Sequence, residues 1–239
     1  MKNILILSSE FPPLPGGIGN HALHLALSLQ KEGKEVTVIT DQRSKKMEDD
    51  IAFDAPLPIK VQRIKRHSMV LFTYWSRIFQ TIKTVNTNKK ITVISSGKFS
   101  LWLGAFVKLL FSRSNCVAVL HGSEIYAGGT LSKRITKWSL SQFDSLVAVS
   151  EFTKNLALET NPNLKITVIN NGFAFPEIEN NNSDFALKGN PAIVTVGNVS
   201  YRKGQQNVIN ALPLLKEKYP EIHYHIIGIP TDFKKLGIW

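Results

Sequence analysis

The order of the apolar segments predicts an α/β fold with a doubly wound parallel sheet. Apolar runs rich in β-branched residues alternate with helical patterns along the whole chain. Several of these runs are continuously hydrophobic, which is typical of strands covered on both faces. Strand–helix–strand units of this kind form right-handed crossovers, so we expect parallel strands with ligands bound at their carboxyl ends.

The expected elements follow from these patterns in chain order. The strands expected are residues 3–8, 35–40, 59–64, 91–95, 116–120, 145–149, 166–169, 191–196 and 222–228. The helices expected between them are residues 17–32, 70–86, 99–111, 131–142, 151–160 and 204–218.

The chain is expected to contain two domains of unequal size. Residues 1–170 can bury a full core and are predicted to form a Rossmann-like domain. Residues 171–190 are rich in Asn and Gly, lack periodicity and are interpreted as a linker. Residues 191–239 contain a single strand–helix–strand unit, too little to cover both faces of a sheet, so we expect only the start of a second Rossmann-like domain.

The composition is that of an ordinary globular protein, with 43% hydrophobic and 20% charged residues. The single cysteine, Cys116, favours a reducing, cytoplasmic setting. No secretory signal is visible, and the longest apolar stretch, 99–111, is shorter than the roughly 20 residues that cross a bilayer. The net charge of +11 would attract phosphates, nucleic acid or anionic lipid. Its lysines look spread along the chain, which favours a solvated surface.

The first glycines raise the question of a dinucleotide site. Gly17, Gly19 and Ala22 fit the fingerprint G-x-G-x-x-[G/A], and Asp41 ends the next strand. However, the segment SSEFPPLPG separates the first strand from the glycines, whereas the fingerprint needs a tight turn there. We therefore interpret Asp41 as an ordinary polar residue at a strand end. The amides at the start of the following helix still favour an anion.

Two further motifs follow strands that should end at the same edge. His121 follows the run CVAVL, beside Gly122 and Glu124, and a histidine there can bind a sugar hydroxyl or a reacting group. The alternative is a structural residue at a strand end. Ser150 in VAVSEFTKN is a good N-cap, which is its simplest role, although a capped helix start also suits a phosphate or hydroxyl.

A fourth motif is VTVGNVSYRKGQQNVINALPLL, residues 194–215. Arg202 and Lys203 stand between Gly197 and Gly204, directly before a helix, and could clamp a diphosphate. The alternative is a solvated loop. His223 and His225 have no apparent third metal ligand, and the acidic run at 48–50 is interpreted as a solvated polar loop.

Together the motifs resemble the retaining GT-B glycosyltransferases of the group 1, or family 4, type, which use nucleotide sugars to make surface polysaccharides and glycolipids. The matching pieces are FPPLPGGIGNHALHLALSLQKEGKEVTVIT, HGSEI, VAVSEFTKN, INNGF and the fourth motif above. The resemblance implies two Rossmann-like domains facing each other across a cleft, with the acceptor mainly on the first and the donor mainly on the second.

The resemblance also implies roles for individual residues. Gly16 and Gly17 would approach the donor diphosphate, and Arg202 and Lys203 would neutralise it as it leaves, so that no metal cofactor is needed. His121 would touch the transferred sugar and act at the reacting centre.

The remaining candidates are assigned on the same basis. Asn20, Glu124 and Ser150 are candidates for substrate binding, and Asn171 and Gly172 would form the hinge between the domains.

Two departures from the family pattern matter. Asn198 stands where many relatives have an arginine. The acidic E-x7-E segment that holds the donor in the family does not appear after Gly228. We therefore expect a C-terminally truncated chain that lacks most of the donor site.

The leading hypothesis is a glycosyltransferase that passes a sugar from a nucleotide sugar to a glycan or lipid-linked acceptor, in a form incomplete for catalysis. The alternative is a non-catalytic module that binds an acceptor or a partner. An NAD-dependent oxidoreductase is disfavoured, and no nucleic-acid partner is expected. A smaller hypothesis is a peripheral contact of residues 98–113 with the inner face of an anionic membrane, through Lys98, Lys108 and Arg113. Their apolar side chains run almost all round the helix, which favours burial instead.

Overall fold

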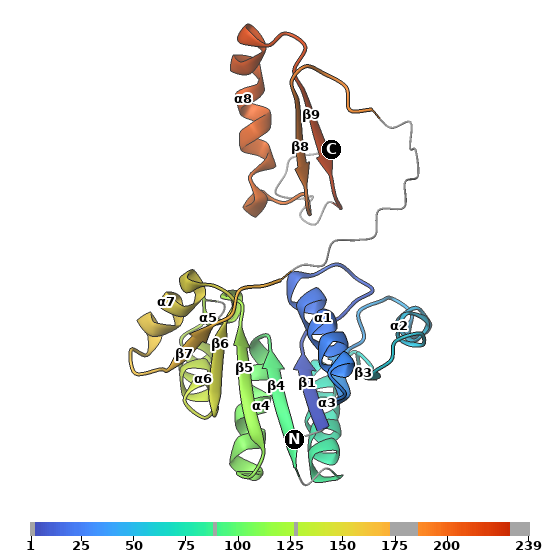
Figure 1. Cartoon of the computed structure of the whole chain (residues 1–239), viewed down its shortest axis with the longest axis vertical. Helices are drawn as coiled ribbons and strands as arrows, with labels where there is room; N and C mark the ends of the chain where they lie inside the picture. Colours follow the sequence, from blue (N-terminus) through green and yellow to red (C-terminus); the bar gives the residue numbers. More distant parts are fainter. Residues whose placement is uncertain (1–2, 88–89, 127–128, 173–185, 230–239) are drawn as a thin grey trace. The chain divides into compact units, whose positions relative to one another are not determined.

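The computed structural model describes residues 3–87, 90–126, 129–172 and 186–229. The chain divides into two compact units, Met1–Ala174 and Phe175–Trp239 (Figure 1). Residues 173–185 of the expected linker and the expected last segment, 230–239, lie outside the described residues.

The first unit is built on a parallel sheet of seven strands in the order β3-β2-β1-β4-β5-β6-β7 (Figure 1). The strands are β1 (Asn3–Ser8), β2 (Glu35–Asp41), β3 (Lys60–Ile64), β4 (Ile91–Ser96), β5 (Asn115–Leu120), β6 (Ser145–Ala148) and β7 (Ile166–Val168). In the central register Leu5 lies opposite Thr37 of β2 and Val93 of β4. The α/β prediction with a parallel sheet is confirmed, and every predicted strand boundary of this unit agrees to within one residue.

Helices cover both faces of this sheet. They are α1 (Gly17–Lys31), α2 (Met47–Asp54), α3 (Val70–Thr87), α4 (Lys98–Leu110), α5 (Ser123–Tyr126), α6 (Thr130–Leu140) and α7 (Glu151–Thr160). The helices α1 and α2 pack on one face, and α3 to α7 pack on the other (Figure 1). Most of the apolar segment 98–113 is the helix α4, whose buried side includes Leu101, Leu103 and Val107, while Phe106, Leu109 and Leu110 are exposed.

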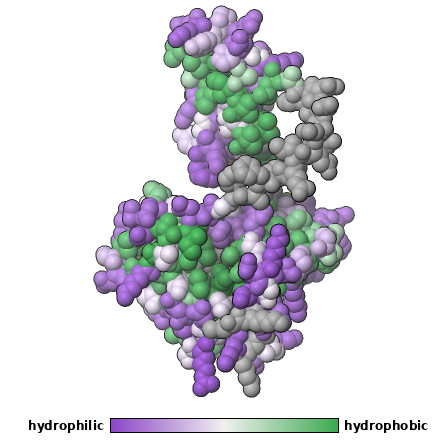
Figure 2. Space-filling model, viewed as in Figure 1, coloured by the Kyte–Doolittle hydropathy of each residue, from purple (hydrophilic) through white to green (hydrophobic). Residues whose placement is uncertain are grey.

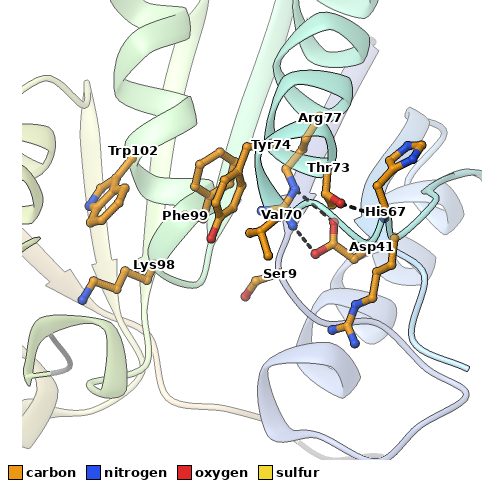
Figure 3. A pocket seen from close by; sticks show the side chains of 11 residues that line it. Ser9, Asp41, His67, Val70, Thr73, Tyr74, Arg77, Lys98, Phe99 and Trp102 are labelled. Carbon is orange, nitrogen blue, oxygen red and sulfur yellow. Dashed lines mark hydrogen bonds and ion pairs between the residues drawn. The ribbon is translucent and has the colours of Figure 1, made fainter.

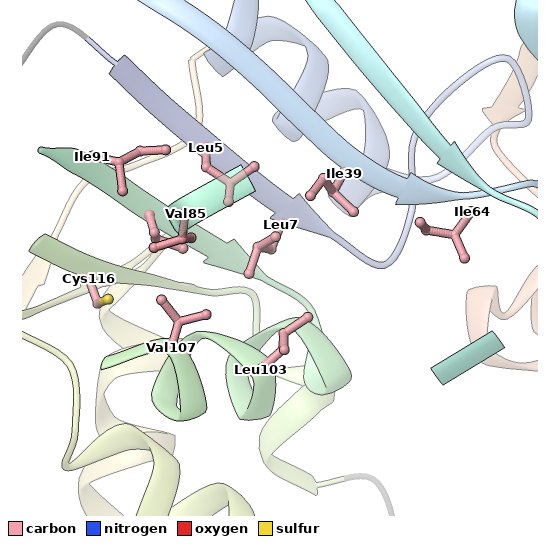
Figure 4. Close-up of a cluster of buried hydrophobic side chains, with 10 residues drawn as sticks. Leu5, Leu7, Ile39, Ile64, Val85, Ile91, Leu103, Val107 and Cys116 are labelled. Carbon is pink, nitrogen blue, oxygen red and sulfur yellow. The ribbon is translucent and has the colours of Figure 1, made fainter. Parts of the chain in front are cut away.

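Alternate residues of each central strand supply two separate cores. Leu5 and Leu7 of β1 pack with α3 and α4, as Figure 4 shows, while Ile4 and Ile6 pack with α1. Strands with a core on each face are apolar at every position, which explains the continuous hydrophobic runs. Cys116 lies within the first of these cores (Figure 4). Burial and the nearby Asp144 raise its pKa to about 12, so it is a packing residue and not a reactive thiolate.

The expectation that residues 48–50 form a solvated polar loop is wrong. They lie in α2, and Asp50 is fully buried. Its carboxylate accepts hydrogen bonds from the amide of Arg43 (2.8 Å) and the hydroxyl of Ser44 (2.7 Å), and Arg63 lies 3.9 Å away. Burial alone would raise the pKa of Asp50, but these hydrogen bonds and the guanidinium together hold it below its ordinary value. Asp50 thus ties α2 to the end of β2.

The second unit contains one parallel pair of strands and a helix. Its elements are β8 (Ala192–Val196), the 3-10 turn η1 (Tyr201–Lys203), α8 (Gln205–Lys218) and β9 (His223–Ile227). Residue Ala192 pairs with His223, and the register continues to Val196 and Ile227. Its elements agree with the predicted strand–helix–strand pattern.

The first unit should lose stability when the Asp50 carboxylate loses its charge. We expect Asp50→Asn to lower the free energy of unfolding by about 2–3 kcal/mol, since it weakens several hydrogen bonds to a buried ion. Asp49→Asn, an exposed neighbour on the same helix, is the matched control and should cost about 0.5 kcal/mol. Urea unfolding followed by tryptophan fluorescence measures both. Equal effects of the two variants would contradict the structural role of Asp50.

Candidate functional site

The carboxyl edge of the sheet has a switch point between β1 and β4. The chain leaves β1 toward β2 on one side, while β4 leads to β5 on the other, so the loops after β1 and β4 separate and leave room for a ligand. The two loops still approach closely at one point, because a side chain on Gly97 would collide with Ser9. Gly97 has a φ of 86°, which favours glycine.

The amino end of α1 lies at this edge. A side chain on its N-cap, Gly16, would meet the carboxylate of Glu10, which lies 3.5 Å from the guanidinium of Arg43. Gly19 packs against the backbone of Phe11. Around Gly17, in contrast, the space that a Cβ would enter is open. A ligand could therefore approach the first turn of α1 at Gly17, on the side away from Glu10.

His121 follows β5 and lies between β4 and α1. Its Nε2 is 2.9 Å from the hydroxyl of Ser96, the last residue of β4. Its ring meets the ring of His21 from α1 edge to face, with centroids 4.9 Å apart. The Nδ1 atom of His21 is buried and has no hydrogen-bond partner among the described residues. The pair therefore presents an unused polar atom beside the predicted reacting group.

Both imidazoles favour the neutral form. Burial lowers the pKa of His121 below its ordinary value of 6.5. The pKa of His21 is also lowered, first by burial and then by the neighbouring His121 and His24. At neutral pH this site therefore offers uncharged rings that can donate or accept hydrogen bonds.

Two predicted substrate-binding residues already hold the backbone. Glu124 is buried, and its carboxylate accepts a hydrogen bond of 2.5 Å from the amide of His121. Ser150 is the N-cap of α7, and its hydroxyl accepts a hydrogen bond of 3.1 Å from the amide of Thr153. Both side chains fix loops at the carboxyl edge through backbone amides. They therefore hold in place the backbone that carries the site.

A groove of about 640 Å³ runs between α1 and the neighbouring strands. The exposed Asn20 and the half-buried His21 line it from α1, and Asn171 and Gly172 line it after β7. Its floor consists of apolar residues in β4, β5 and β6 and directly after β6 and β7, namely Ile94, Val117, Val119, Val147, Val149 and Ile169. Figure 2 shows apolar surface beside α1 on this face of the first unit.

A second cavity, of about 660 Å³, lies at the amino ends of α3 and α4 (Figure 3). Asp41 borders it, but its carboxylate is held by Arg77, with Nε 3.0 Å from Oδ1 and a second bond from the guanidinium. Tyr74 and Phe99 stack on one side with ring centroids 4.4 Å apart. Asp41 is therefore the partner of a buried arginine, and no free carboxylate is available for a ribose.

In the second unit, the candidate clamp is an exposed turn. Arg202 and Lys203 lie in η1, and Gly204 follows with a φ of 74°. Neither cation forms an ion pair within the part of the chain that the structure describes. The buried Gln205 accepts a hydrogen bond from the amide of Ser200 and donates one to the carbonyl of Asn198.

Sequence reasoning missed two of these residues. Gln205 fixes the loop that carries the cations, and its only signal was a polar residue directly after Gly204. His21 was not singled out, although a histidine four residues after Gly17, in the helix that follows the first strand, is a usable signal.

Comparison with known families identifies the chain. The profile of Glycosyltransferase Family 4 matches residues 15–174. The chain belongs to glycosyltransferase family 4. The profile of Glycosyl transferases group 1 matches residues 177–237.

Family 4 relatives are similar over nearly the whole chain. A glycogen synthase of Mycobacterium tuberculosis is 25% identical over 96% of this chain. An uncharacterized glycosyltransferase of Methanocaldococcus jannaschii is 26% identical over 90% of it. The chain spans 62% and 60% of the lengths of these two relatives.

Solved structures show the same fold. Anabaena HepE in complex with UDP and glucose is 17% identical, with a TM-score of 0.66 over 98% of this chain and 63% of its own. A mutant of S. aureus TarM in complex with Fondaparinux, alpha-GlcNAc-glycerol and UDP is 10% identical, with a TM-score of 0.68 over 99% of this chain and 74% of its own. This likeness confirms the GT-B type of fold.

The described residues show neither a cluster of metal ligands nor a membrane-spanning helix. They contain no group of three or more His, Cys, Asp or Glu side chains arranged to hold a metal ion. Among these residues, no helix combines the length and the apolar character needed to cross a bilayer.

The two histidines of this family 4 site should titrate at low pH. We expect the imidazoles of His21 and His121 to have midpoints below 6.5, because burial penalises their charged forms. The folded state binds fewer protons than the unfolded state below pH 6.5, so stability present above that pH should fall as the solution is acidified.

Proton–carbon NMR of the imidazoles measures these midpoints, with His21→Gln and His121→Gln providing the assignments. A midpoint at or above 6.5 for either ring would contradict the buried, neutral pair.

Proposed function

We propose that this chain contributes the acceptor-side domain and the start of the donor-side domain of a glycosyltransferase. The enzyme transfers a sugar with retention, from a nucleotide sugar to a glycan or lipid-linked acceptor, in surface polysaccharide or glycolipid biosynthesis. It acts in the cytoplasm, where the lone thiol Cys116 stays reduced. Membership of family 4 supports the class of reaction. The observation that carries the proposal is the polar cluster of His121, Ser96 and His21 at the carboxyl edge of the sheet.

His121 contacts the transferred sugar in this proposal. Sugar transfer passes through an oxocarbenium-like transition state, in which positive charge develops on the sugar ring. A charged imidazolium would repel that charge, whereas a neutral ring can hydrogen-bond a sugar hydroxyl without opposing it. The lowered pKa of His121 supports this role because it keeps the ring neutral at pH 7.

Negative charge develops on the diphosphate as it leaves the sugar. Positive groups beside the diphosphate therefore stabilise the transition state of the transfer. The first turn of α1 offers backbone amides and the positive end of a helix, with open space at Gly17 and the carboxylate of Glu10 beside Gly16. Arg202 and Lys203 offer two cations in the turn before α8. Either set of groups can stabilise a leaving phosphate in place of a metal ion.

The remaining candidates have supporting roles. Glu124 and Ser150 position the loops after β5 and β6 through the hydrogen bonds described above. The exposed Asn20 lines the groove beside His21 and is available to an acceptor. Asn171 and Gly172 are exposed and outside regular structure, which suits a hinge.

The proposal is tested by titrating the chain with UDP, GDP and their common sugar conjugates in a calorimeter. The variant with Arg202→Ala and Lys203→Ala should bind the preferred nucleotide at least about tenfold more weakly, since charge-assisted contacts to phosphate are lost. The matched control carries Lys216→Ala and Lys218→Ala at the other end of α8, removing the same charge.

Equal losses in both double variants would mean general electrostatic attraction and would contradict the clamp. If a chain that melts cooperatively binds none of these nucleotides, the result would instead favour a non-catalytic module for an acceptor or partner.

A further inference from the structure

The net positive charge of this chain comes from one segment, contrary to the even spread expected above. Between residues 55 and 123 there are eleven lysines and arginines and no aspartate or glutamate. The rest of the chain contains 18 basic and 18 acidic residues, so this segment accounts for the whole net charge of +11. It comprises β3, α3, β4, α4 and β5.

Three of these cations are used inside the fold. Arg63 pairs with Asp54, Arg77 with Asp41, and Lys108 with Asp144. Six others are exposed and form no ion pair within the described ranges, namely Lys60, Lys65, Arg66, Lys83, Lys90 and Arg113. Lys65 and Arg66 stand directly before α3, and Lys83 lies in its last turns.

The helix α3 has its polarity reversed relative to an ordinary surface helix. The side that faces the sheet is mainly polar and includes Thr73, Arg77, Thr81 and Thr84. The opposite side carries Leu71, Trp75 and Phe79 at intervals of four residues, which are 64%, 67% and 68% exposed. A surface helix of a globular protein normally buries its apolar stripe, so this stripe is available to something outside the unit.

The polar side of α3 is bound in place. The guanidinium of Arg77 is paired with Asp41 at the end of β2. The hydroxyl of Thr73 accepts a hydrogen bond of 3.0 Å from the amide of His67. Rotating α3 to bury its apolar stripe would break both contacts, so the outward orientation of the stripe is a property of the fold.

We propose that α3 docks the protein onto an anionic lipid bilayer. The docking surface consists of Met69, Val70, Leu71, Phe72, Trp75 and Phe79, all of them exposed. Apolar and aromatic side chains on one side of a helix, with cations beside them, form the pattern of helices that lie in the plane of a membrane surface. Anionic headgroups meet the charge of the acid-free segment, which neutral lipid would leave unpaired.

The basic charge beside α3 favours an anionic bilayer, and not a second copy of the chain, as the partner of this surface. Two copies associated through α3 would bring two acid-free, basic segments together, and like charges across an interface oppose association. The cavity of Figure 3 adds a feature that suits lipid, because it shares Arg66, Val70 and Tyr74 with the end of α3 where docking occurs. Its aromatic and cationic walls can take up an anionic headgroup beside the apolar surface.

Co-sedimentation with vesicles tests the apolar part of the proposal. The whole chain should bind vesicles in which one third of the lipid is phosphatidylglycerol and the rest is phosphatidylcholine. The variant with Trp75→Ser and Phe79→Ser should bind at least about tenfold more weakly, since two exposed aromatic anchors are removed. Phe152→Ser, a residue of α7 that is 71% exposed, is the matched control and should bind as the wild type does. All three substituted positions are exposed, and a thermal melt verifies folding of each protein.

A second pair of variants tests the charge. Lys65→Gln with Arg66→Gln should weaken binding about 25-fold, at roughly fivefold for each basic residue near an anionic surface. Lys45→Gln with Lys46→Gln, at exposed positions before α2, makes the same change in net charge and should have little effect.

Three outcomes would overturn the proposal. They are equal binding to vesicles of pure phosphatidylcholine, equal binding by the α3 variants and their controls, and a dimer in solution that the Trp75→Ser and Phe79→Ser changes dissociate. These measurements do not involve nucleotides. A failure of membrane docking would therefore leave the proposed sugar transfer untouched, and that proposal is tested separately by the nucleotide titrations.

Discussion

All the candidate groups of the first unit depend on one constraint, the parallel course of its seven strands. Parallel strands bring every carboxyl end to the same edge, so the segments after β1, β4, β5 and β6 meet although they lie far apart in sequence. From β1 the chain adds strands on one side of the sheet, and from β4 it adds them on the other side. The loops that follow β1 and β4 therefore diverge, and they open the edge where α1 begins. His21, Ser96 and His121 are neighbours for this reason, and the chemistry of the site follows from the topology before any single side chain is considered.

The ion pair between Arg77 and Asp41 has a wider effect than its position suggests. It links α3 to the end of β2 and closes one wall of the cavity in Figure 3. The guanidinium also lies 4.5 Å from the ring centre of Phe99, which brings α3 and α4 together at their amino ends. With the polar residues of α3 turned to the sheet, its apolar residues are left outside. A buried pair of charges thus accounts for an exposed apolar surface.

The strands and most helices were predictable because each one is encoded locally. A strand with a core on both faces is apolar throughout, so its limits are visible in the sequence, and the N-cap Ser150 could be recognised for a similar reason. Partners distant in sequence could not be predicted. Asp50 looked like one of three solvated acids until the fold brought Arg63 to it, and the role of Glu124 depends on a backbone amide at a strand end.

The site shows the same division between local and distant information. His121 was predicted from its place after a strand, but its contact with His21 requires α1 to cross the sheet at a particular angle. The reversed polarity of α3 was also hidden, because a helical pattern indicates that one side is apolar without indicating which side faces the sheet. The charge of residues 55–123, in contrast, was visible in the sequence and needed only to be counted by segment.

The most direct test of the central claim is to map where a nucleotide sugar meets the first unit. The nitrogen-labelled chain is titrated with UDP-glucose, and the amide signals of the wild type are compared with those of Gly17→Ala. This change adds a methyl group where the structure has open space, so it should leave the fold intact. The account predicts that the signals near Gly17 and His121 shift in the wild type and shift much less in the variant. Shifts confined to the turn at Arg202 and Lys203, with the signals of the first unit unmoved, would contradict it.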